Sequence, residues 1–381
     1  MSETTRRQFL EVAGTAAAAT FLLPAARAAG QVAPVPAPPA LPVASPLPVG
    51  PGAPYSSYQS EIYVAGMGAD VKPIFTTNLS DLEAAAAKVL SEPARRHLLE
   101  WAGGPGAVRA NARKLASWRI VPRMLIDRAE RDLSATVLGV TMPAPIILGP
   151  IGSQVLAHPD AEGATAQAAA AVGLTYVHAA QASTPVEGVA AAAPTGSRWF
   201  GLDWPKGSGP DTALLTRARL AGCTHLVLSH PRPGKGWEAL GAIRGAWDGP
   251  IVLSGVQTVR DARTAVRLGF EGLVVSNERG RRGSTAAGTI DVLPRVVDAV
   301  GGQIAVLFGS GVRTGTDVYR ALALGAQAVL IGRPYVHGLA LGGEPGVRHM
   351  LRTLLAELDI TLAIAGVASY RELRPSALVR A

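Results

Sequence analysis

The sequence alternates short apolar runs with helix-length segments, and this alternation is the feature that most restricts its fold. Eight apolar runs are typical of buried parallel strands, and segments such as Ala161–Val172 and Val259–Leu268 between them are predicted helices. We therefore predict an α/β fold of the (β/α)8 TIM barrel type, with a doubly wound open sheet as the alternative. The predicted strands are Pro145–Gly149, Leu174–Ala180, Arg198–Trp204, Thr224–His230, Ile251–Val256, Gly272–Asn277, Ile304–Phe308 and Ala328–Ile331.

One or more helices are expected before the barrel. The run Ser80-Asp81-Leu82-Glu83 has the pattern of a capping box and predicts a helix that continues to about Leu90. We expect two or three such N-terminal helices to flank the barrel or cover its base. The barrel domain with these helices is assigned to residues 76–381.

The first 28 residues have the pattern of a twin-arginine signal peptide. Arg6 and Arg7 precede an apolar, alanine-rich run from Val12 to Leu23, and the segment ends in Ala26-Arg27-Ala28 with small residues at the exit. The apolar run is too short to span a bilayer stably, so we expect cleavage near Ala28, no stable membrane insertion afterwards, and a periplasmic or secreted protein. An uncleaved anchor is the alternative. This route exports folded proteins, which suits a chain that takes up a cofactor in the cytoplasm.

Residues 29–75 are predicted to be a linker. Nine prolines lie between Gln31 and Pro54, with no charged residue among them, and such a segment favours extended polyproline conformations over a packed core. Cys223 is the only cysteine, so an internal disulfide is excluded even in an oxidising compartment. Stability must therefore come from the core of the barrel.

The formal net charge is +8, but the arginines are scattered along the chain without a dense basic block. This pattern does not favour nucleic-acid binding and is explained more simply by a small anionic ligand. Histidine, cysteine and carboxylate residues show no metal-ligand spacing, so no metal site is predicted.

Two neighbouring strand ends near the C-terminus carry bare glycine backbone and one arginine each. Gly309-Ser310-Gly311 and Arg313 follow the seventh predicted strand, and Gly332-Arg333 follow the eighth. Glycine lets backbone N–H groups approach an oxygen ligand, a following helix directs its positive end at it, and arginine adds charge-assisted hydrogen bonds. The pair predicts a phosphate site, against the alternative of two ordinary turns with surface arginines.

Most of the other strand ends have small or hydroxyl-bearing side chains. Gly152, Ser229, Ser254 and Ser276 lie at or just after the first, fourth, fifth and sixth predicted strands. In a barrel of this type, chemistry is found at the carboxyl ends of the strands. These residues are expected to bind a large, flat ligand through backbone and hydroxyl hydrogen bonds.

The segment from about Leu79 to Leu378 resembles the FMN-dependent α-hydroxy acid oxidases and dehydrogenases, which include glycolate oxidase and lactate oxidase. The resemblance implies a TIM barrel whose phosphate site holds FMN, a small carboxylate substrate, and a homo-oligomer. The matching pieces are Ala157-His158-Pro159 with Glu162, Asp261-Ala262-Arg263, Val275-Ser276-Asn277, Gly311-Val312-Arg313 with Gly315-Thr316-Asp317, Ala321-Leu322-Ala323-Leu324-Gly325-Ala326 and Ile331-Gly332-Arg333-Pro334.

The resemblance also exposes departures at the catalytic positions. Glu278 stands where the family has its catalytic histidine, and Ser254 stands where the family has a lysine that stabilises the reduced flavin. Arg281 matches the arginine that binds the substrate carboxylate. By resemblance, Glu278 is the candidate base and Arg281 the candidate anion anchor, although an ion pair of Glu278 with neighbouring arginines is the alternative.

Four further departures lie around the same end of the barrel. Gly201 and Asp203 replace a glutamine and a tyrosine, Leu98 falls near a substrate-facing tyrosine, and the loop 231–237 is shorter than in relatives. Loss of the lysine is expected to lower the flavin potential, and glutamate is a weaker base than histidine unless burial raises its pKa. The sequence thus predicts an FMN-dependent oxidoreductase with altered substrate or chemistry. The alternatives are an FMN-binding protein without turnover and a flavin-free barrel for another phosphate ligand.

Overall fold

Eight parallel strands close into a barrel within the larger of two units of the chain, Val49–Ala381. The structure is a computed structural model that describes residues 55–58, 78–99, 104–123, 126, 130–204, 209–229, 237, 239–277 and 288–381. The predicted TIM barrel is confirmed, and its strands end within two residues of the predicted bounds. In order around the barrel, the strands are β10 (Ala305–Gly309), β11 (Ala328–Ile331), β4 (Ile146–Leu148), β5 (Thr175–Ala179), β6 (Arg198–Leu202), β7 (Leu226–Ser229), β8 (Ile251–Val256) and β9 (Gly272–Val275).

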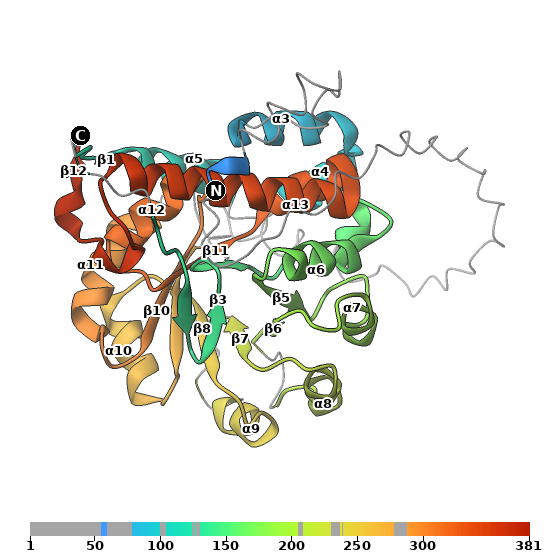
Figure 1. Ribbon diagram of the computed structural model, residues 1–381. Coiled ribbons are helices and arrows are strands. Elements are labelled where there is room, and N and C mark those ends of the chain that lie inside the picture. Colours follow the sequence, from blue (N-terminus) through green and yellow to red (C-terminus); the bar gives the residue numbers. More distant parts are fainter. Residues whose placement is uncertain are drawn as a thin grey trace, which may run out of the picture. The chain divides into compact units, whose positions relative to one another are not determined.

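Helices between the strands are arranged around the barrel (Figure 1). Side-chain caps begin several of them, and α12 has a full capping box between Thr314 and Asp317. The last helix, α13, is kinked where Gly342 and Gly343 leave helical geometry. No helix in this described part combines the length and apolar composition needed to cross a bilayer. The helices are α6 (Ala161–Ala171), α7 (Val186–Ala192), α8 (Thr212–Leu220), α9 (Ala239–Ala246), α10 (Val259–Arg267), α11 (Thr289–Val300), α12 (Gly315–Ala323) and α13 (Arg333–Ile364).

Alternate residues of the strands fill the interior of the barrel. Val177, Trp199, Val227 and Val252 pack there with side chains of a hairpin formed by β2 (Ala135–Val137) and β3 (Val140–Met142). The hairpin closes the N-terminal end of the barrel. The carbonyl oxygen of its turn residue Leu138 lies 2.9 Å from Nε2 of His225, the residue just before β7. The carboxyl ends of the strands are left for ligands.

Between Asn78 and the barrel, the described residues form the helices α3 (Leu79–Val89), α4 (Glu92–Leu99) and α5 (Gly104–Ala116). Helix α3 contacts α13, and α5 contacts α11 and α12, so these helices flank the barrel. Of the two predicted positions, flanking the barrel or covering its base, the first is confirmed, and the hairpin closes the base instead. The predicted helix that ends near Leu90 is confirmed as α3, but it begins at Leu79, so Ser80 lies inside it and does not cap it.

The remaining elements are short. Strand β1 (Trp118–Ile120) pairs antiparallel with β12 (Leu378–Arg380), which joins the end of the chain to the segment before the barrel. Within the described ranges, the 3-10 helices are η1 (Gln154–Leu156), η2 (Tyr370–Glu372) and η3 (Pro375–Ala377).

Residues 55–58, which fall within the predicted linker, pack on helix α13. Ser56 donates its backbone N–H to Asp359 Oδ2 at 2.9 Å, and the Tyr58 hydroxyl lies 2.8 Å from His349 Nδ1. The guanidinium of Arg352 stacks 3.8 Å above the Tyr58 ring. This short segment is therefore attached to the barrel domain by polar and aromatic contacts.

Candidate functional site

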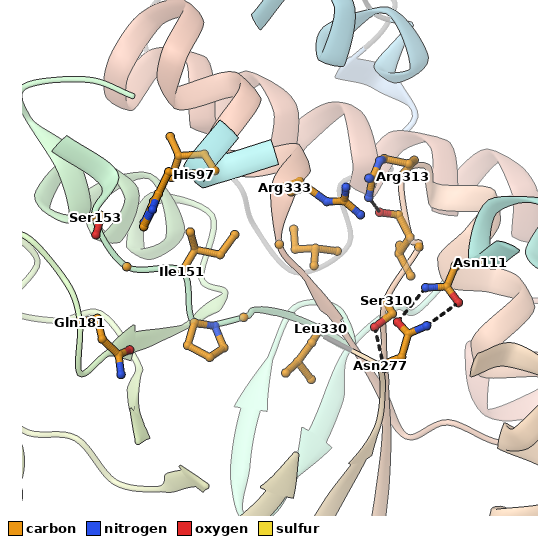
Figure 2. A pocket seen from close by; sticks show the side chains of 18 of the residues that line it. His97, Asn111, Ile151, Ser153, Gln181, Asn277, Ser310, Arg313, Leu330 and Arg333 are labelled. Carbon is orange, nitrogen blue, oxygen red and sulfur yellow. Dashed lines mark hydrogen bonds between the residues drawn. The ribbon is translucent and has the colours of Figure 1, made fainter. Parts of the chain in front are cut away.

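A cavity of about 390 Å³ opens at the carboxyl ends of the strands. Its size falls within the range of about 300–1,000 Å³ that is usual for small-molecule sites. Figure 2 shows that its side chains come from both the strand ends and the N-terminal helices. The lining residues are His97, Leu98, Asn111, Gly149, Pro150, Ile151, Gly152, Ser153, Gln181, Asp203, Asn277, Ser310, Gly311, Val312, Arg313, Leu330, Ile331, Gly332 and Arg333.

The loop after β10 is held in an unusual backbone conformation. Ser310 has φ 88°, which strains an ordinary residue, and Gly311 has φ 87°. A Cβ on Gly311 would also lie 2.7 Å from the Asn111 Cβ, so no larger residue fits there. The strained loop presents bare backbone at the cavity wall, as expected for an anion site.

Two arginines give this side of the cavity its positive potential. Burial, and next the charge of Arg313, lower the pKa of Arg333 to about 10, while Glu83 acts in the opposite direction. Arg333 still carries its charge at neutral pH. Burial, with the same two arginines, lowers the pKa of the nearby His337 to about 3, so this histidine is neutral. A multiply charged anion between the arginines would relieve their repulsion.

Arg313 has an internal counter-ion on a neighbouring helix. Its Nε lies 3.4 Å from Glu83 Oε2 of α3, and its Nη1 donates to the Val312 carbonyl oxygen at 3.1 Å. The backbone N–H groups of Arg313 and Thr314 are bound instead by the Asp317 carboxylate. The guanidinium is thus positioned by contacts on one side while the residue lines the cavity.

A buried pair of amides joins α5 to the end of β9. Asn111 Nδ2 donates to Asn277 Oδ1 at 2.8 Å, and Asn277 Nδ2 donates back at 3.2 Å (Figure 2). Asn111 Oδ1 also accepts from the backbone N–H of Thr289 at 3.2 Å, and Asn277 donates its own N–H to Ser310 Oγ at 3.1 Å. Asn111 therefore fixes the strand end at the cavity. Sequence reasoning missed it, because no local pattern relates residues so far apart in the chain.

A buried glutamate orders the opposite wall. Glu162 accepts hydrogen bonds from the backbone N–H groups of Gln154, Ser183 and Thr184. Burial alone would raise the pKa of Glu162, but these hydrogen bonds hold it below its usual value. The carboxylate joins the loops after β4 and β5. A Cβ on Gly152 in the first loop would lie 2.5 Å from the Gln181 carbonyl oxygen in the second, so the two loops meet at glycine.

The predicted site residues fall into three groups. Six line the cavity: Gly152, Ser310, Gly311, Arg313, Gly332 and Arg333. Four others are not among the lining residues: Gly309 ends β10, Ser229 ends β7, Ser254 lies within β8, and Ser276 directly follows β9. The buried Ser276 hydroxyl has no hydrogen-bond partner among the described residues. Glu278 and Arg281 lie outside the described residues, so their roles stay predictions.

Two residues that differ from those of the resembling family also line the cavity. Leu98 of α4 contributes an apolar wall, and Asp203 follows β6 with its Oδ1 accepting a hydrogen bond from Ser229 Oγ at 3.3 Å. His97, next to Leu98, lines the cavity as well and was not predicted. Only the tertiary fold brings α4 to the strand ends.

The sequence profile of the family described as FMN-dependent dehydrogenase matches residues 86–231 and 229–380, which together span most of the chain. The chain belongs to this family. Its members are FMN-dependent 2-hydroxy acid oxidoreductases, so FMN is the cofactor and the resemblance noted in the sequence is confirmed.

Individual relatives agree with the family assignment. The chain is 35% identical over 378 residues to an FMN-dependent alpha-hydroxy acid dehydrogenase of Penicillium citrinum, with 84% of this chain and 94% of that protein covered. It is 30% identical over 360 residues to an L-lactate oxidase of Lysinibacillus sphaericus, with 80% and 93% covered. A crystal structure of mandelate oxidase with 3,3-difluoro-2-hydroxy-3-phenylpropionic acid superposes with a TM-score of 0.72 at 33% identity, covering 80% of this chain and 99% of that one.

The residues present fit FMN. Arg313 and Arg333 form a cationic wall beside bare backbone at Gly311 and Gly332, which suits a phosphate. The polar side chains of Asn277 and Ser310, which also line the cavity, suit the polar edge of a ring. These residues would hold the phosphate and one edge of the cofactor, and the cavity between the two walls would receive the ring system.

Proposed function

We propose that this protein oxidises a small 2-hydroxy acid to the 2-oxo acid, with an active site that differs from those of glycolate and lactate oxidases. In this reaction the hydroxy acid loses two electrons and two protons. Bound FMN supplies the electron acceptor. One observation supports the proposal above the others. Arg313 and Arg333 line the same cavity at the carboxyl ends of the strands, in a barrel of this family.

The residues that act on the substrate are predicted to follow β9. Glu278 is the proposed base that takes a proton from the substrate, and Arg281 is the proposed anchor of its carboxylate. Burial would have to raise the pKa of a glutamate for it to act well near neutral pH. The proposal therefore predicts that Glu278→Gln abolishes substrate oxidation while FMN stays bound.

Changed chemistry is supported by the residues at two other strand ends. Ser254 lies in the second half of β8, where the resemblance implies a lysine, and Asp203 adds a carboxylate to the cavity wall. A serine cannot provide the cation that a lysine offers to the reduced cofactor, and a carboxylate repels a second carboxylate nearby. We therefore propose a substrate other than glycolate or lactate, bound with its carboxylate away from Asp203.

We also propose that the protein is exported by the twin-arginine route to the periplasm or beyond, as a homo-oligomer. Arg6, Arg7 and the apolar run to Leu23 support export, and residues 29–75 would then act as the linker to the barrel. Export in the folded state allows FMN to be bound before translocation. Fusing residues 1–28 to a reporter, with Arg6 and Arg7 replaced by lysine as the control, tests the route.

The visible spectrum tests the proposed function. The protein is purified from the cytoplasm with its signal removed, and its flavin absorbance is recorded before and after anaerobic addition of L-lactate, glycolate, mandelate and larger 2-hydroxy acids. Bleaching by at least one of these acids is the expected result. A yellow protein that no 2-hydroxy acid bleaches would favour an FMN-binding protein without turnover, and a colourless one would favour another phosphate ligand.

A further inference from the structure

Ser153 and Gln181 bring polar side chains to the cavity that make no hydrogen bond to other described residues. Ser153 follows β4 and Gln181 follows β5, two strands that lie two and three places from β10 in the closed barrel. Figure 2 shows both residues on the side of the cavity away from Arg313 and Asn111. The two side chains therefore form a polar, uncharged patch that is separate from the arginine-bearing side.

The Ser153 hydroxyl is not used by the fold. Ser153 stands at the N-cap of η1, where a serine hydroxyl ordinarily accepts a hydrogen bond from a backbone N–H of the first turn. Here the N–H of Val155 donates to Ser183 Oγ at 3.0 Å, and the N–H of Leu156 donates to the Ser153 carbonyl oxygen at 3.1 Å. Ser153 also has φ 58°, in the left-handed region that costs an ordinary residue energy. The loop thus holds this serine in an unfavourable conformation with its hydroxyl left for a ligand.

The backbone of Gln181 is fixed, whereas its side chain is exposed. Its carbonyl oxygen accepts a hydrogen bond from the Ser153 N–H at 3.1 Å. Gly152 packs so closely against Gln181 that an added Cβ on this glycine would lie 3.1 Å from the Gln181 Cβ. The side chains of Ser153 and Gln181 therefore begin on two loops that are held together, and both reach the same cavity.

The chemistry of the patch restricts what it can bind. A serine hydroxyl and a glutamine amide each donate and accept hydrogen bonds, and neither carries a charge. A carboxamide or a hydroxyl group on a ligand also donates and accepts, so it matches both side chains. An apolar group would displace water from them without replacing its hydrogen bonds, and a carboxylate would lose hydration without gaining a cation from either residue.

We propose that Ser153 and Gln181 form a specificity subsite that selects 2-hydroxy acids whose side chain ends in an uncharged hydrogen-bonding group, above all a carboxamide. The proposal rests on the proposed function, since it names the substrate class of the same cavity. Both residues contact the end of the substrate side chain, and neither takes part in the oxidation.

Three acids of nearly the same shape test the proposal. (S)-2-Hydroxysuccinamate, (S)-2-hydroxysuccinate and (S)-2-hydroxy-4-methylpentanoate end in a carboxamide, a carboxylate and an isopropyl group. The same three ends are also tested on a chain longer by one CH2 group, because the glutamine side chain has several rotamers. Dissociation constants are measured anaerobically by calorimetry on the full chain with its FMN reduced beforehand, so that oxidation does not consume the ligand. Bleaching of the oxidised flavin is measured separately.

We expect the carboxamide to bind at least about 10-fold more tightly than the isopropyl compound at the better of the two chain lengths. Two hydrogen bonds between neutral groups that stay partly exposed to water account for a difference of this size. The carboxylate should bind more weakly than the carboxamide, because the patch offers it no charge.

Variants separate a direct contact from a structural role. Gln181→Met keeps the length of the side chain and removes its hydrogen-bonding groups, so the preference for the carboxamide should fall below about 3-fold while the isopropyl compound binds equally or more tightly. Ser153→Gly removes the hydroxyl and also suits φ 58°, so it should fold at least as stably and lose part of the preference. Gln167→Met is the matched control, because Gln167 is exposed on α6 and does not line the cavity.

The outcomes distinguish this inference from the proposed function. Equal affinity for the carboxamide and isopropyl compounds, no binding of any of the acids, or a preference that survives in both variants would overturn the subsite, even if another 2-hydroxy acid bleaches the flavin. An equal loss of affinity for all three ends in Gln181→Met would also overturn it, since that is the result of a structural defect. A preference that depends on Gln181, without bleaching by any 2-hydroxy acid, would support the subsite and refute the proposed oxidation.

Discussion

At the scale of single residues, the charges at the proposed phosphate site, the side of the cavity formed by Arg313, Arg333, Gly311 and Gly332, come from two arginines and one nearby glutamate. This side is called the phosphate wall below. Arg313 and Arg333 repel each other, since the charge of Arg313 helps to lower the pKa of Arg333. Glu83 relieves part of that repulsion from α3. A phosphate would take over this role with more negative charge and better geometry, so ligand binding and the Glu83 contact compete for Arg313.

Removing either arginine should weaken FMN binding. We expect Arg313→Ala and Arg333→Ala each to cost about 1.5–3 kcal/mol of binding free energy, because each removes a charge-assisted hydrogen bond to phosphate. The measurement is flavin fluorescence on titration of the flavin-free protein with FMN. Arg217→Ala, which breaks an exposed ion pair with Glu187, is the control. Unchanged affinity in both cavity variants would rule out this wall as the phosphate site.

Removing the competing carboxylate should have the opposite effect. We expect Glu83→Gln to tighten FMN binding several-fold, since Glu83 is partly exposed and its pairing with Arg313 is worth about 1 kcal/mol or less. The gain should shrink as ionic strength rises, because salt screens an exposed pair. If the affinity falls instead, Glu83 would be orienting Arg313 for the phosphate rather than competing with it.

At the scale of elements, helix α13 packs against the start of α12, the helix that follows the loop with Gly311 and Arg313. Gly315 begins α12 directly against α13, where an added Cβ would lie 2.2 Å from the Leu358 backbone nitrogen. Glu357 of α13 accepts a hydrogen bond from the Gly315 N–H at 2.7 Å. Burial raises the pKa of Glu357 to about 7, the Gly315 hydrogen bond opposes this rise, and Asp317 adds to it. The contact between the two helices therefore contains a group that titrates near neutral pH.

Stability should depend on pH through Glu357. A raised pKa means that the folded state binds the proton more tightly than the unfolded state, so the free energy of unfolding falls as pH rises from about 4.3 toward 7. Glu357→Gln keeps an acceptor for Gly315 without the titration. We expect the variant to gain about 3 kcal/mol relative to the unaltered protein between pH 4 and pH 8. Denaturant unfolding at both pH values measures this, and a pH-independent difference would contradict it.

At the scale of the whole molecule, the barrel domain extends toward the N-terminus beyond its first helices. In the unit Val49–Ala381, Ser56 and Tyr58 bind Asp359 and His349 of α13. A protein that starts at Val49 should keep its full stability and FMN content. One that starts at Leu79 should lose about 1–3 kcal/mol of unfolding free energy, because it loses these hydrogen bonds and the stacking on Tyr58.

Thermal or denaturant unfolding of the two truncated proteins, both saturated with FMN, makes the comparison. Tyr58→Phe in the protein from Val49 is the finer control, since it removes only the hydroxyl next to His349 Nδ1. Equal stability of the two truncated proteins would show that the contacts of residues 55–58 add nothing to the barrel.

Local patterns predicted the barrel well, because a buried parallel strand or an amphipathic helix can be recognised from a short stretch of sequence. Gly309–Gly311 and Gly332–Arg333 were recognisable for the same reason, since each lies within one strand-to-helix junction. The N-terminal helices were harder. Their role at the cavity depends on His97, Leu98 and Asn111, which lie near strand ends that are distant in the sequence. No periodic pattern within a short segment predicts contacts between such distant residues.

The sequence by itself determined the eight-strand pattern, the glycine and arginine pairs of the phosphate wall, and the family, because each depends on residues close together along the chain. Only the tertiary structure decided that Asp203 lies across the barrel from Arg313, that Glu83 pairs with Arg313, and that Asn111 joins α5 to β9. These arrangements depend on how a closed sheet orders its strands and how helices pack over their ends. The free energy of packing between distant segments determines these arrangements, and this free energy cannot be predicted from the sequence of one segment alone.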